Sequence, residues 1–205
     1  MRRSLPTRLV IATHNQGKLH EFAELFRPYV SDVVSSGALG LPSPEETGTT
    51  CVENALLKAR TASQLLADPS SLVIADDSGL FIDALQGRPG VYSADWIKPD
   101  AKAAMQRVQN ELGAAADRSA YFLCILALCW ADGHTEIVEG RTNGTIARAP
   151  RGVDGHGYDP IFVPEGRTRT FAEMSAEEKN ALSHRGRATK ALIEKFFSHL
   201  PQHGA

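Results

Sequence analysis

The apolar residues of the chain alternate between short continuous runs, which are typical of buried strands, and longer runs with helical spacing. Residues 9–12 form the first short run, and residues 19–26 then place apolar side chains along one helical face. The same succession returns with a helical pattern over residues 52–66 and a short apolar run over residues 72–75. This alternation of strands and helices predicts an α/β fold.

The second half of the chain adds longer strands. Residues 120–130, AYFLCILALCW, are the most apolar run and predict a central strand. Residues 134–146 alternate apolar and polar side chains and contain Asn143-Gly144, a pair that favours hairpin turns. We therefore expect an antiparallel pair of strands there and a mixed sheet, with a further helix over residues 101–112.

Two helix starts are marked by residues that can satisfy free backbone N–H groups. Thr50 with Glu53 three positions later has the pattern of a capping box in front of the second helix. Ser175 with Glu178 has the same pattern, and the helix that follows is expected to run from residue 175 to residue 200.

The composition is that of a soluble globular protein. Of the 205 residues, 42% are hydrophobic and 22% are charged, so residues 1–205 can form a single domain with two lobes. The formal net charge of −2 gives no overall basic field, which argues against nucleic acid or an anionic membrane as a partner. The three cysteines have no metal-ligand spacing, and no apolar run reaches the roughly 20 residues of a membrane-spanning helix. We therefore expect a cytoplasmic protein.

Two adjacent carboxylates, Asp76 and Asp77, directly follow the apolar run of residues 72–75. Like charges repel each other and are costly to remove from water, and a turn needs only one Asp. We therefore expect a cation site or a proton-accepting site at the end of this strand.

The segment ATHNQGK, residues 12–18, follows a strand and opens a helix. Backbone N–H groups and the helix dipole favour an anion at such a position. Asn15 can cap the helix, Gly17 allows close approach of a ligand, and Lys18 adds a positive charge. The P-loop pattern is absent, however, and a capped helix start with a surface lysine explains the segment better when it is taken alone.

A second acidic pair, Glu45 and Glu46, supports the interpretation that residues 12–18 bind the phosphate of a ligand. It precedes a helix on which Asn54 and Lys58 lie one turn apart. The glutamates could simply favour the positive end of that helix. With the two aspartates, however, they offer the hard oxygen ligands that Mg²⁺ takes together with phosphate and water. Lysines for phosphate and carboxylates for magnesium therefore occur in the same chain.

A third group of polar residues lies near the C-terminal end. The motif HGYDP, residues 156–160, contains a glycine that permits an unusual turn or a close approach. The motif EEKNALSHR predicts one helix on which Lys179 and Ser183, and likewise Asn180 and His184, are one-turn neighbours. The alternative for SHR is a helix end at which His and Arg complement the negative end of the dipole.

Five motifs together carry a resemblance to a known family. In chain order they are ATHNQGKLHEF, EETGTTCVENALLKA, IADDSGLFIDALQGRPGVYSA, GYDPIF and TFAEMSAEEKNALSHRGRA. Through them the chain resembles the Ham1/RdgB family of noncanonical purine nucleoside triphosphate pyrophosphatases, which includes inosine triphosphatase. Each motif alone is weak, but five in the same order are specific.

The resemblance implies an α/β fold with an elongated mixed β-sheet flanked by helices and two lobes around a central cleft. It implies a Mg²⁺-dependent enzyme that hydrolyses ITP, dITP and XTP to the monophosphate and pyrophosphate, which removes deaminated purines from the nucleotide pool. The expected partner is the purine nucleoside triphosphate substrate, and the expected assembly is a homodimer.

The resemblance also implies roles for particular residues. Asp77 is the expected proton acceptor and a metal ligand, and Glu45 or Glu46 completes the metal site. The expected substrate-binding residues are Thr13, His14, Asn15, Gln16, Gly17, Lys18, Lys58, Ser78, His156, Gly157, Tyr158, Asp159, Lys179, His184 and Arg185.

Two other functions compete with this interpretation. A Maf-like pyrophosphatase that acts on pyrimidine or modified nucleotides shares the general architecture but should lack SHR after EEKNAL. A non-catalytic nucleotide-binding module is favoured if the acidic pairs are only helix caps. Incubation with Mg²⁺ and ITP, XTP, dTTP, ATP or GTP, with pyrophosphate and orthophosphate measured separately, distinguishes the three possibilities.

Overall fold

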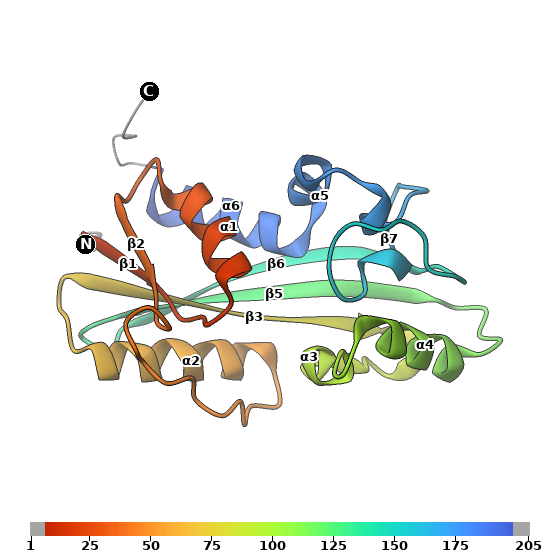
Figure 1. The fold of residues 1–205 in the computed structure, drawn as a ribbon, viewed down its shortest axis with the longest axis horizontal. Coiled ribbons are helices and arrows are strands. Elements are labelled where there is room, and N and C mark those ends of the chain that lie inside the picture. The colour runs from red at the N-terminus through yellow and green to blue at the C-terminus, as the bar shows by residue number, and fades with distance from the viewer. Residues whose placement is uncertain (1–6, 199–205) are drawn as a thin grey trace. The chain divides into compact units, whose positions relative to one another are not determined.

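The computed structural model describes residues 7–198, apart from the side chains of Gln16 and Glu21. These residues form an α/β fold built on one mixed seven-stranded sheet (Figure 1). The strands are β1 (Arg8–Ile11), β2 (Asp32–Ser35), β3 (Ser71–Ile82), β4 (Pro89–Gly90), β5 (Ser119–Trp130), β6 (Thr135–Ile146) and β7 (Phe162–Pro164). The α-helices are α1 (Gln16–Phe26), α2 (Cys51–Leu66), α3 (Ser93–Trp96), α4 (Ala101–Leu112), α5 (Ala176–Leu182) and α6 (His184–Phe196).

The sheet has the strand order β2-β1-β3-β5-β6-β7, and the short strand β4 forms an additional pair with β3. β1 runs parallel to both of its neighbours, with Leu9 opposite Val33 on β2 and Leu72 on β3. β3 and β4 are antiparallel, as are β6 and β7. The predicted α/β class and the mixed sheet are therefore confirmed, and β5 lies inside the sheet as its apolar sequence predicts.

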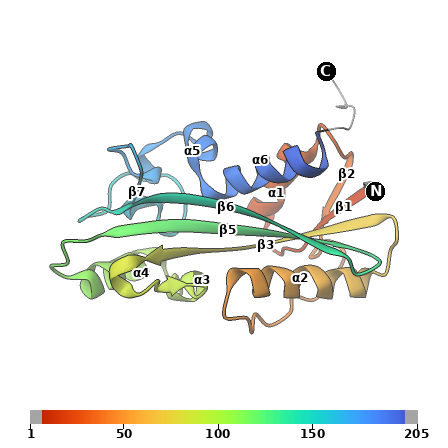
Figure 2. The same ribbon diagram turned by 180° about the vertical axis from the view of Figure 1, so that it is seen from behind.

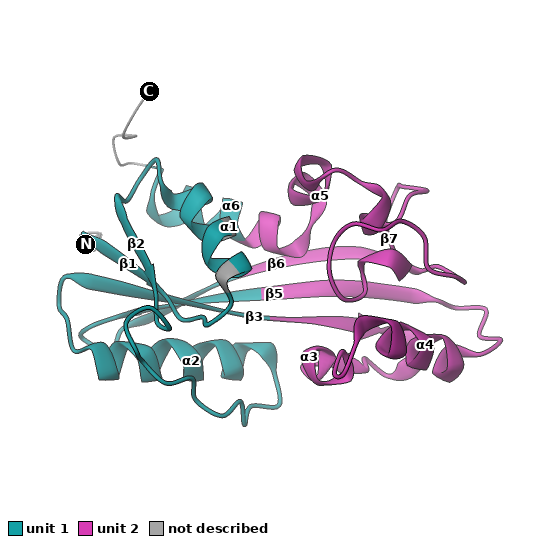
Figure 3. Cartoon of the chain, in the orientation of Figure 1, with its two compact units in different colours: residues 1–77, 125–138, 189–205 teal, residues 78–124, 139–188 magenta. Residues whose placement is uncertain are grey.

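The chain divides into two compact units (Figure 3). Unit 1 contains residues 1–77, 125–138 and 189–205, and unit 2 contains residues 78–124 and 139–188. The long strands β3, β5 and β6 each contribute residues to both units. The boundary on β3 falls directly after Asp77.

The core of unit 1 surrounds its parallel strands. Residues 9–11 of β1 are fully buried, as expected for a parallel strand covered on both faces. Helix α2 lies on one side of these strands, with Ala55 and Ala59 fully buried, and α1 and the unit 1 part of α6 lie on the other (Figures 1 and 2). There the ring of Phe26 contacts that of Phe197, with 5.2 Å between ring centres.

The core of unit 2 is aromatic. Phe122 of β5 packs against Phe162 of β7 with 4.6 Å between ring centres, and Phe162 packs against Phe171 at 5.3 Å. Val108 of α4 and Leu80 of β3 are fully buried in the same cluster. The apolar face of the predicted helix over residues 101–112 is therefore the face that covers this sheet.

The turn predicted at Asn143-Gly144 is wrong. β6 continues through both residues, and Gly144 pairs with Pro164 of β7. A side chain at residue 144 would collide with the carbonyl oxygen of Val163, so the glycine serves close strand pairing and not a turn. The chain instead reverses before His134, whose carbonyl accepts a 3.0 Å hydrogen bond from the Trp130 N–H.

The structure of residues 7–198 also tests the expectations about membrane-spanning helices and cysteines. No helix in this part of the chain has the length and apolar character needed to cross a membrane. Cys51, Cys124 and Cys129 are all buried, and none of them is in a disulfide bond among these residues.

The backbone of β6 passes close to the first turn of α6 at Gly140. A Cβ at this position would overlap the carbonyl oxygen of His184 and the amide nitrogen of Ala188. Gly140→Ala should therefore lower the free energy of unfolding by about 1–3 kcal/mol, measured by urea denaturation. The control Glu139→Ala alters an exposed neighbour and should change it by less than about 0.5 kcal/mol. Equal stability of the two variants would contradict this close contact.

Candidate active site

The acidic pair lies inside β3 and not at a strand end, so that expectation is wrong. β3 extends from Ser71 to Ile82, and its pairing with β4 at Leu80 shows that the ladder continues past the pair. The apolar run ends at residue 75, but the strand continues through the polar residues that follow it and through Gly79. The lack of a side chain at Gly79 allows close approach of the Gly90 carbonyl.

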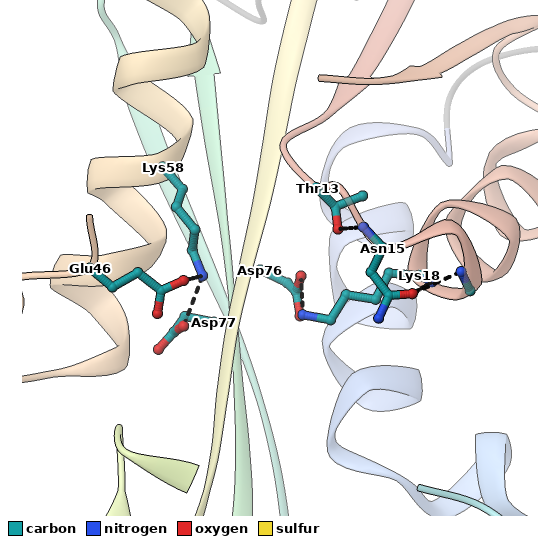
Figure 4. A network of polar contacts seen from close by, with 8 residues as sticks. Thr13, Asn15, Lys18, Glu46, Lys58, Asp76 and Asp77 are labelled. Carbon is teal, nitrogen blue, oxygen red and sulfur yellow. Dashed lines mark hydrogen bonds and ion pairs between the residues drawn. The ribbon is translucent and has the colours of Figure 1, made fainter. Parts of the chain in front are cut away.

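Successive side chains of a strand point to opposite faces of the sheet. Asp76 therefore points toward α1, whereas Asp77 points toward α2 (Figure 4). Each carboxylate meets a different lysine: Asp76 binds Lys18 and Asp77 binds Lys58. Two like charges that are adjacent in sequence are thus separated by the sheet, and each is neutralised by its own cation.

On the α2 face, the Lys58 ammonium bridges two carboxylates. Lys58 Nζ donates to Asp77 Oδ1 at 2.8 Å and to Glu46 Oε1 at 3.0 Å. The side chains of Lys58 and Asp77 are only 10% and 8% exposed, whereas that of Glu46 is 44% exposed. The second oxygen of Asp77, Oδ2, is buried without a hydrogen-bond partner among the described residues. This cluster therefore has an acceptor oxygen to offer to a ligand.

Burial and the neighbouring charges shift the pKa values of Lys58 and Asp77 in opposite directions. Burial raises the pKa of Asp77, although the adjacent Lys58 ammonium opposes the shift. Burial lowers the pKa of Lys58, but the carboxylates of Asp77, Asp76 and Glu46 outweigh it, and the net pKa is raised. Lys58 is therefore held in its charged form beside an aspartate that is costly to ionise.

Helix α2 positions Lys58 and begins as the sequence predicts. The Thr50 side chain accepts a hydrogen bond from the Glu53 N–H, and the Glu53 carboxylate accepts one from the Thr50 N–H. The capping box is thus confirmed. Lys58 lies two turns further along the helix, where its ammonium reaches β3.

On the other face, Lys18 and Asp76 form a two-oxygen ion pair. Lys18 Nζ lies 2.9 Å from Oδ1 and 2.8 Å from Oδ2 of Asp76. Asp76 is almost fully buried, whereas Lys18 is 32% exposed. Lys18 is therefore not simply a surface lysine, and Asp76 orients an ammonium that solvent can still reach.

The loop before α1 is shaped by its own side chains. Asn15 caps the helix, because its Oδ1 accepts from the N–H groups of Gly17 at 2.8 Å and Lys18 at 3.2 Å. The hydroxyl of Thr13 accepts from the Asn15 N–H at 3.1 Å. The side chain of His14 is exposed, and that of Gln16 lies outside the described residues. The loop thus places Lys18 in the first turn of α1.

In unit 2, the motif HGYDP forms a compact polar turn. Asp159 Oδ2 accepts from the His156 N–H and from Lys179 Nζ, both at 2.6 Å. Gly157 has a φ of +61°, which a residue with a side chain rarely adopts. Tyr158 is buried, and burial raises its pKa. Its hydroxyl donates to the carbonyl of Ser93 at 3.1 Å, a partner that sequence reasoning did not identify.

The expected continuous helix over residues 175–200 is wrong. α5 ends at Leu182, Ser183 is extended, and α6 begins at His184, while residues 199 and 200 lie outside the described residues. The hydroxyl of Ser183 accepts from the Gly186 N–H at 3.0 Å, a side-chain bond that competes with a continuous helix. The Ser175 capping box of α5 is confirmed.

His184 and Arg185 consequently open a helix. They occupy the positive end of its dipole, where a cation is disfavoured and an anion is favoured, so the dipole-complement alternative for SHR does not apply. The His184 ring stacks on Phe122 with 4.7 Å between ring centres and an angle of 11°. Ser78, at the start of unit 2, has a buried hydroxyl oxygen without a hydrogen-bond partner among the described residues.

The expected metal ligands are only partly brought together. Glu46 and Asp77 each direct an oxygen at the same cationic atom, Lys58 Nζ, while Glu45 is exposed on the loop. Within residues 7–198, no three His, Cys, Asp or Glu side chains form a ready metal cluster. Two converging carboxylates with one unpartnered oxygen nevertheless fit Mg²⁺, which takes one or two protein carboxylates and fills its other positions with water and phosphate.

Known proteins resemble the chain over nearly its full length. It matches the model of the Ham1 family over residues 9–195. A dITP/XTP pyrophosphatase of Rhodospirillum centenum is 50% identical over 195 residues, 93% of this chain and 95% of that protein. A dITP/XTP pyrophosphatase of Gluconobacter oxydans is 50% identical over 196 residues, 94% and 93% of the two chains. The structure of a HAM1 protein from Coxiella burnetii has a TM-score of 0.85 and 41% identity, covering 94% of this chain and 98% of that one.

The buried pair of Lys58 and Asp77 should contribute far more to stability than a surface pair. Lys58→Met leaves a buried carboxylate without its main counter-charge, and should lower the free energy of unfolding by about 3 kcal/mol or more. The control Arg8→Met breaks the half-exposed pair with Asp32 and should cost about 1 kcal/mol or less. Urea denaturation at neutral pH measures both, and similar losses would contradict the burial of the Lys58 pair.

Proposed function

Because the chain belongs to the Ham1 family, we propose that it hydrolyses the noncanonical purine nucleoside triphosphates ITP, dITP and XTP to the monophosphate and pyrophosphate. Relatives of 50% identity that are named dITP/XTP pyrophosphatase support this substrate class. The observation that carries the proposal is the ion pairing at β3, where Lys58 binds both Asp77 and Glu46, and Lys18 binds Asp76. These are the carboxylates and ammonium groups that hydrolysis of a triphosphate requires.

Asp77 is proposed as the general base. A water molecule attacks the α-phosphorus, the bond from that phosphorus to the bridging oxygen breaks, and pyrophosphate leaves. Asp77 accepts the proton of the attacking water, and a well-placed base of this kind accelerates a reaction by roughly 10²–10⁴-fold.

Mg²⁺ is proposed as the cofactor, held by Glu46 and Asp77. Glu46 is preferred to Glu45 because only Glu46 shares a cationic partner with Asp77. When bound, Mg²⁺ withdraws charge from the phosphate oxygens. The ammonium of Lys58 adds a second positive charge beside the same carboxylates, which further favours an anionic substrate.

The triphosphate is proposed to bind the loop of residues 13–18. Lys18 provides the charge, and the buried carboxylate of Asp76 limits the positions that its ammonium can take. Asn15 fixes the first turn of α1, so that Lys18 is presented from an ordered backbone. Fixed charges lose less freedom on binding than mobile ones, which strengthens the interaction.

Residues of unit 2 are proposed to recognise the base and sugar. Hypoxanthine and xanthine carry an acceptor, O6, where adenine carries an amino donor. His184, Arg185 and Lys179 are donors that would pair with O6 but would find no acceptor at this position of adenine, which is a basis for rejecting ATP. Ser78, Tyr158 and the backbone around Gly157 are proposed to complete these contacts.

The resemblance also leads us to propose the assembly and location of the protein. We propose that residues 1–205 act as a single domain with two lobes, and that two copies form a homodimer. Since the proposed substrates belong to the free nucleotide pool, we place the enzyme in the cytoplasm.

The products formed from a panel of nucleotides test the proposed function. With Mg²⁺ present, ITP and XTP should release pyrophosphate, whereas ATP should be hydrolysed at least roughly a hundredfold more slowly, because its 6-amino group offers no acceptor to the donors that meet O6. GTP carries the same O6, so slower hydrolysis of GTP would have to rest on its 2-amino group. Removal of Mg²⁺ with a chelator should stop the reaction. Pyrophosphate and orthophosphate are measured separately.

Three outcomes would contradict the proposal. Release of orthophosphate alone would indicate a different bond cleavage. Preferred hydrolysis of dTTP would favour a Maf-like pyrophosphatase. Binding of ITP without turnover would favour a non-catalytic nucleotide-binding module.

A further inference from the structure

The loop that carries Glu46 is attached to helix α2 by Asn54. The side chain of Asn54 is buried, with the residue only 2% exposed. Its Oδ1 accepts a 2.8 Å hydrogen bond from the N–H of Gly48, which lies two residues after Glu46. This contact joins the loop of residues 42–50, which carries Glu46, to the first turns of α2.

The contact requires a residue without a side chain on the loop. A Cβ at Gly48 would lie 2.5 Å from Asn54 Oδ1 and 2.7 Å from the Cβ of Glu53, which is closer than real Cβ atoms approach other groups. Gly48 does not have a positive φ, so the glycine is explained by close approach to α2 and not by backbone conformation.

Asn54 and Lys58 both contact the Glu46 loop from the same face of α2. The two residues are four positions apart on α2, and side chains with this spacing lie on the same helical face. Lys58 binds Glu46 at 3.0 Å, and Asn54 binds the backbone two residues further along the same loop. One helical face therefore contacts the Glu46 carboxylate and also anchors the loop that presents it.

The capping box holds a different part of the loop. Glu53 Oε2 accepts from the N–H groups of Thr49 and Thr50 at 2.7 and 3.0 Å. These bonds secure the residues that directly precede the helix. The Asn54 bond is the contact nearer to Glu46, and it restrains the loop segment that determines where the glutamate can lie.

We propose that Asn54 is a positioning residue that fixes Glu46 for metal binding beside Asp77. The proposal rests on the proposed function, because it takes Glu46 and Asp77 as the Mg²⁺ ligands. Without the Asn54 bond, the loop gains freedom and the second carboxylate is available for only part of the time. Binding the metal must then also supply the free energy to order the loop, so metal affinity falls. Loss of groups that orient metal ligands typically weakens metal affinity by roughly 10–100-fold.

Two variants and one control separate positioning from general stability. Asn54→Ala removes the acceptor, whereas Asn54→Asp keeps an oxygen that can accept from the Gly48 N–H. Ser63→Ala is the matched control, because Ser63 lies on the same helix and its hydroxyl donates to the Trp130 carbonyl at 3.3 Å, away from the loop. Ser63→Ala thus also removes a buried side-chain bond of α2.

Each protein is assayed with saturating ITP over a series of Mg²⁺ concentrations, and hydrogen exchange of residues 42–50 is measured without substrate. For Asn54→Ala we expect the half-saturating Mg²⁺ concentration to rise by about tenfold or more, while kcat at saturating Mg²⁺ is largely recovered. Exchange of residues 42–50 should also become faster. Asn54→Asp should keep the exchange of residues 42–50 close to wild type, because it retains an acceptor for the Gly48 N–H, and Ser63→Ala should alter neither measurement.

The inference is overturned if Asn54→Ala lowers kcat without changing the Mg²⁺ dependence, or if Ser63→Ala shifts that dependence equally. It is also overturned if exchange of residues 42–50 is unchanged in Asn54→Ala. Failure of the proposed function gives a different result, because the wild-type protein would then hydrolyse no ITP at any Mg²⁺ concentration.

Discussion

The alternation of side chains along β3 is the constraint on which the candidate site depends. Asp76 and Asp77 are neighbours in sequence, yet the pleat of the strand directs them to opposite faces. Each then meets its own lysine, from α1 on one face and from α2 on the other (Figure 4). A pair of charges that would be unfavourable in a turn becomes two separate ion pairs inside unit 1.

This separation links the packing of unit 1 to its chemistry. The helix starts are fixed by local bonds, from Asn15 at α1 and from Thr50 with Glu53 at α2. The helices in turn bring Lys18 and Lys58 to the strand. Buried charges are tolerated only when they are paired, so the burial of both aspartates depends on the placement of both helices. The same pairs leave a partly exposed lysine side chain on one face, and on the other a carboxylate oxygen that has no hydrogen-bond partner among the described residues.

Much of the architecture could be predicted from the sequence because it depends on local signals. Hydrophobic spacing identified α1, α2, α4 and the buried strands, and the capping boxes of α2 and α5 were identified from Ser or Thr followed by Glu. The errors occurred where distant contacts overrule local preference. Gly144 resembles a turn residue, but it and Gly79 each allow another strand to approach.

In the candidate site, too, local sequence signals could be interpreted, whereas contacts between distant residues could not. Composition and motif order indicated that acidic residues and lysines act together, and the structure brings Glu46, Lys58 and Asp77 into contact. The role of Asp76 could not be derived, because it depends on which lysine reaches each face of β3. The break at Ser183 was missed as well, since a helical pattern alone does not reveal a side chain that caps the next helix.

The central claim is that the two aspartates have separate tasks, with Asp77 as the base and Asp76 as the partner that orients Lys18. The most direct measurement compares kcat and KM for ITP in Asp77→Asn and Asp76→Asn, with circular dichroism to confirm that both variants are folded. Asp77→Asn should lower kcat by roughly a thousandfold with little change in KM, because proton transfer is lost in the transition state. Asp76→Asn should mainly raise KM, because on this account Lys18 binds the phosphates both before and during the reaction. An equal loss of kcat in both variants, or full activity in Asp77→Asn, would contradict the account.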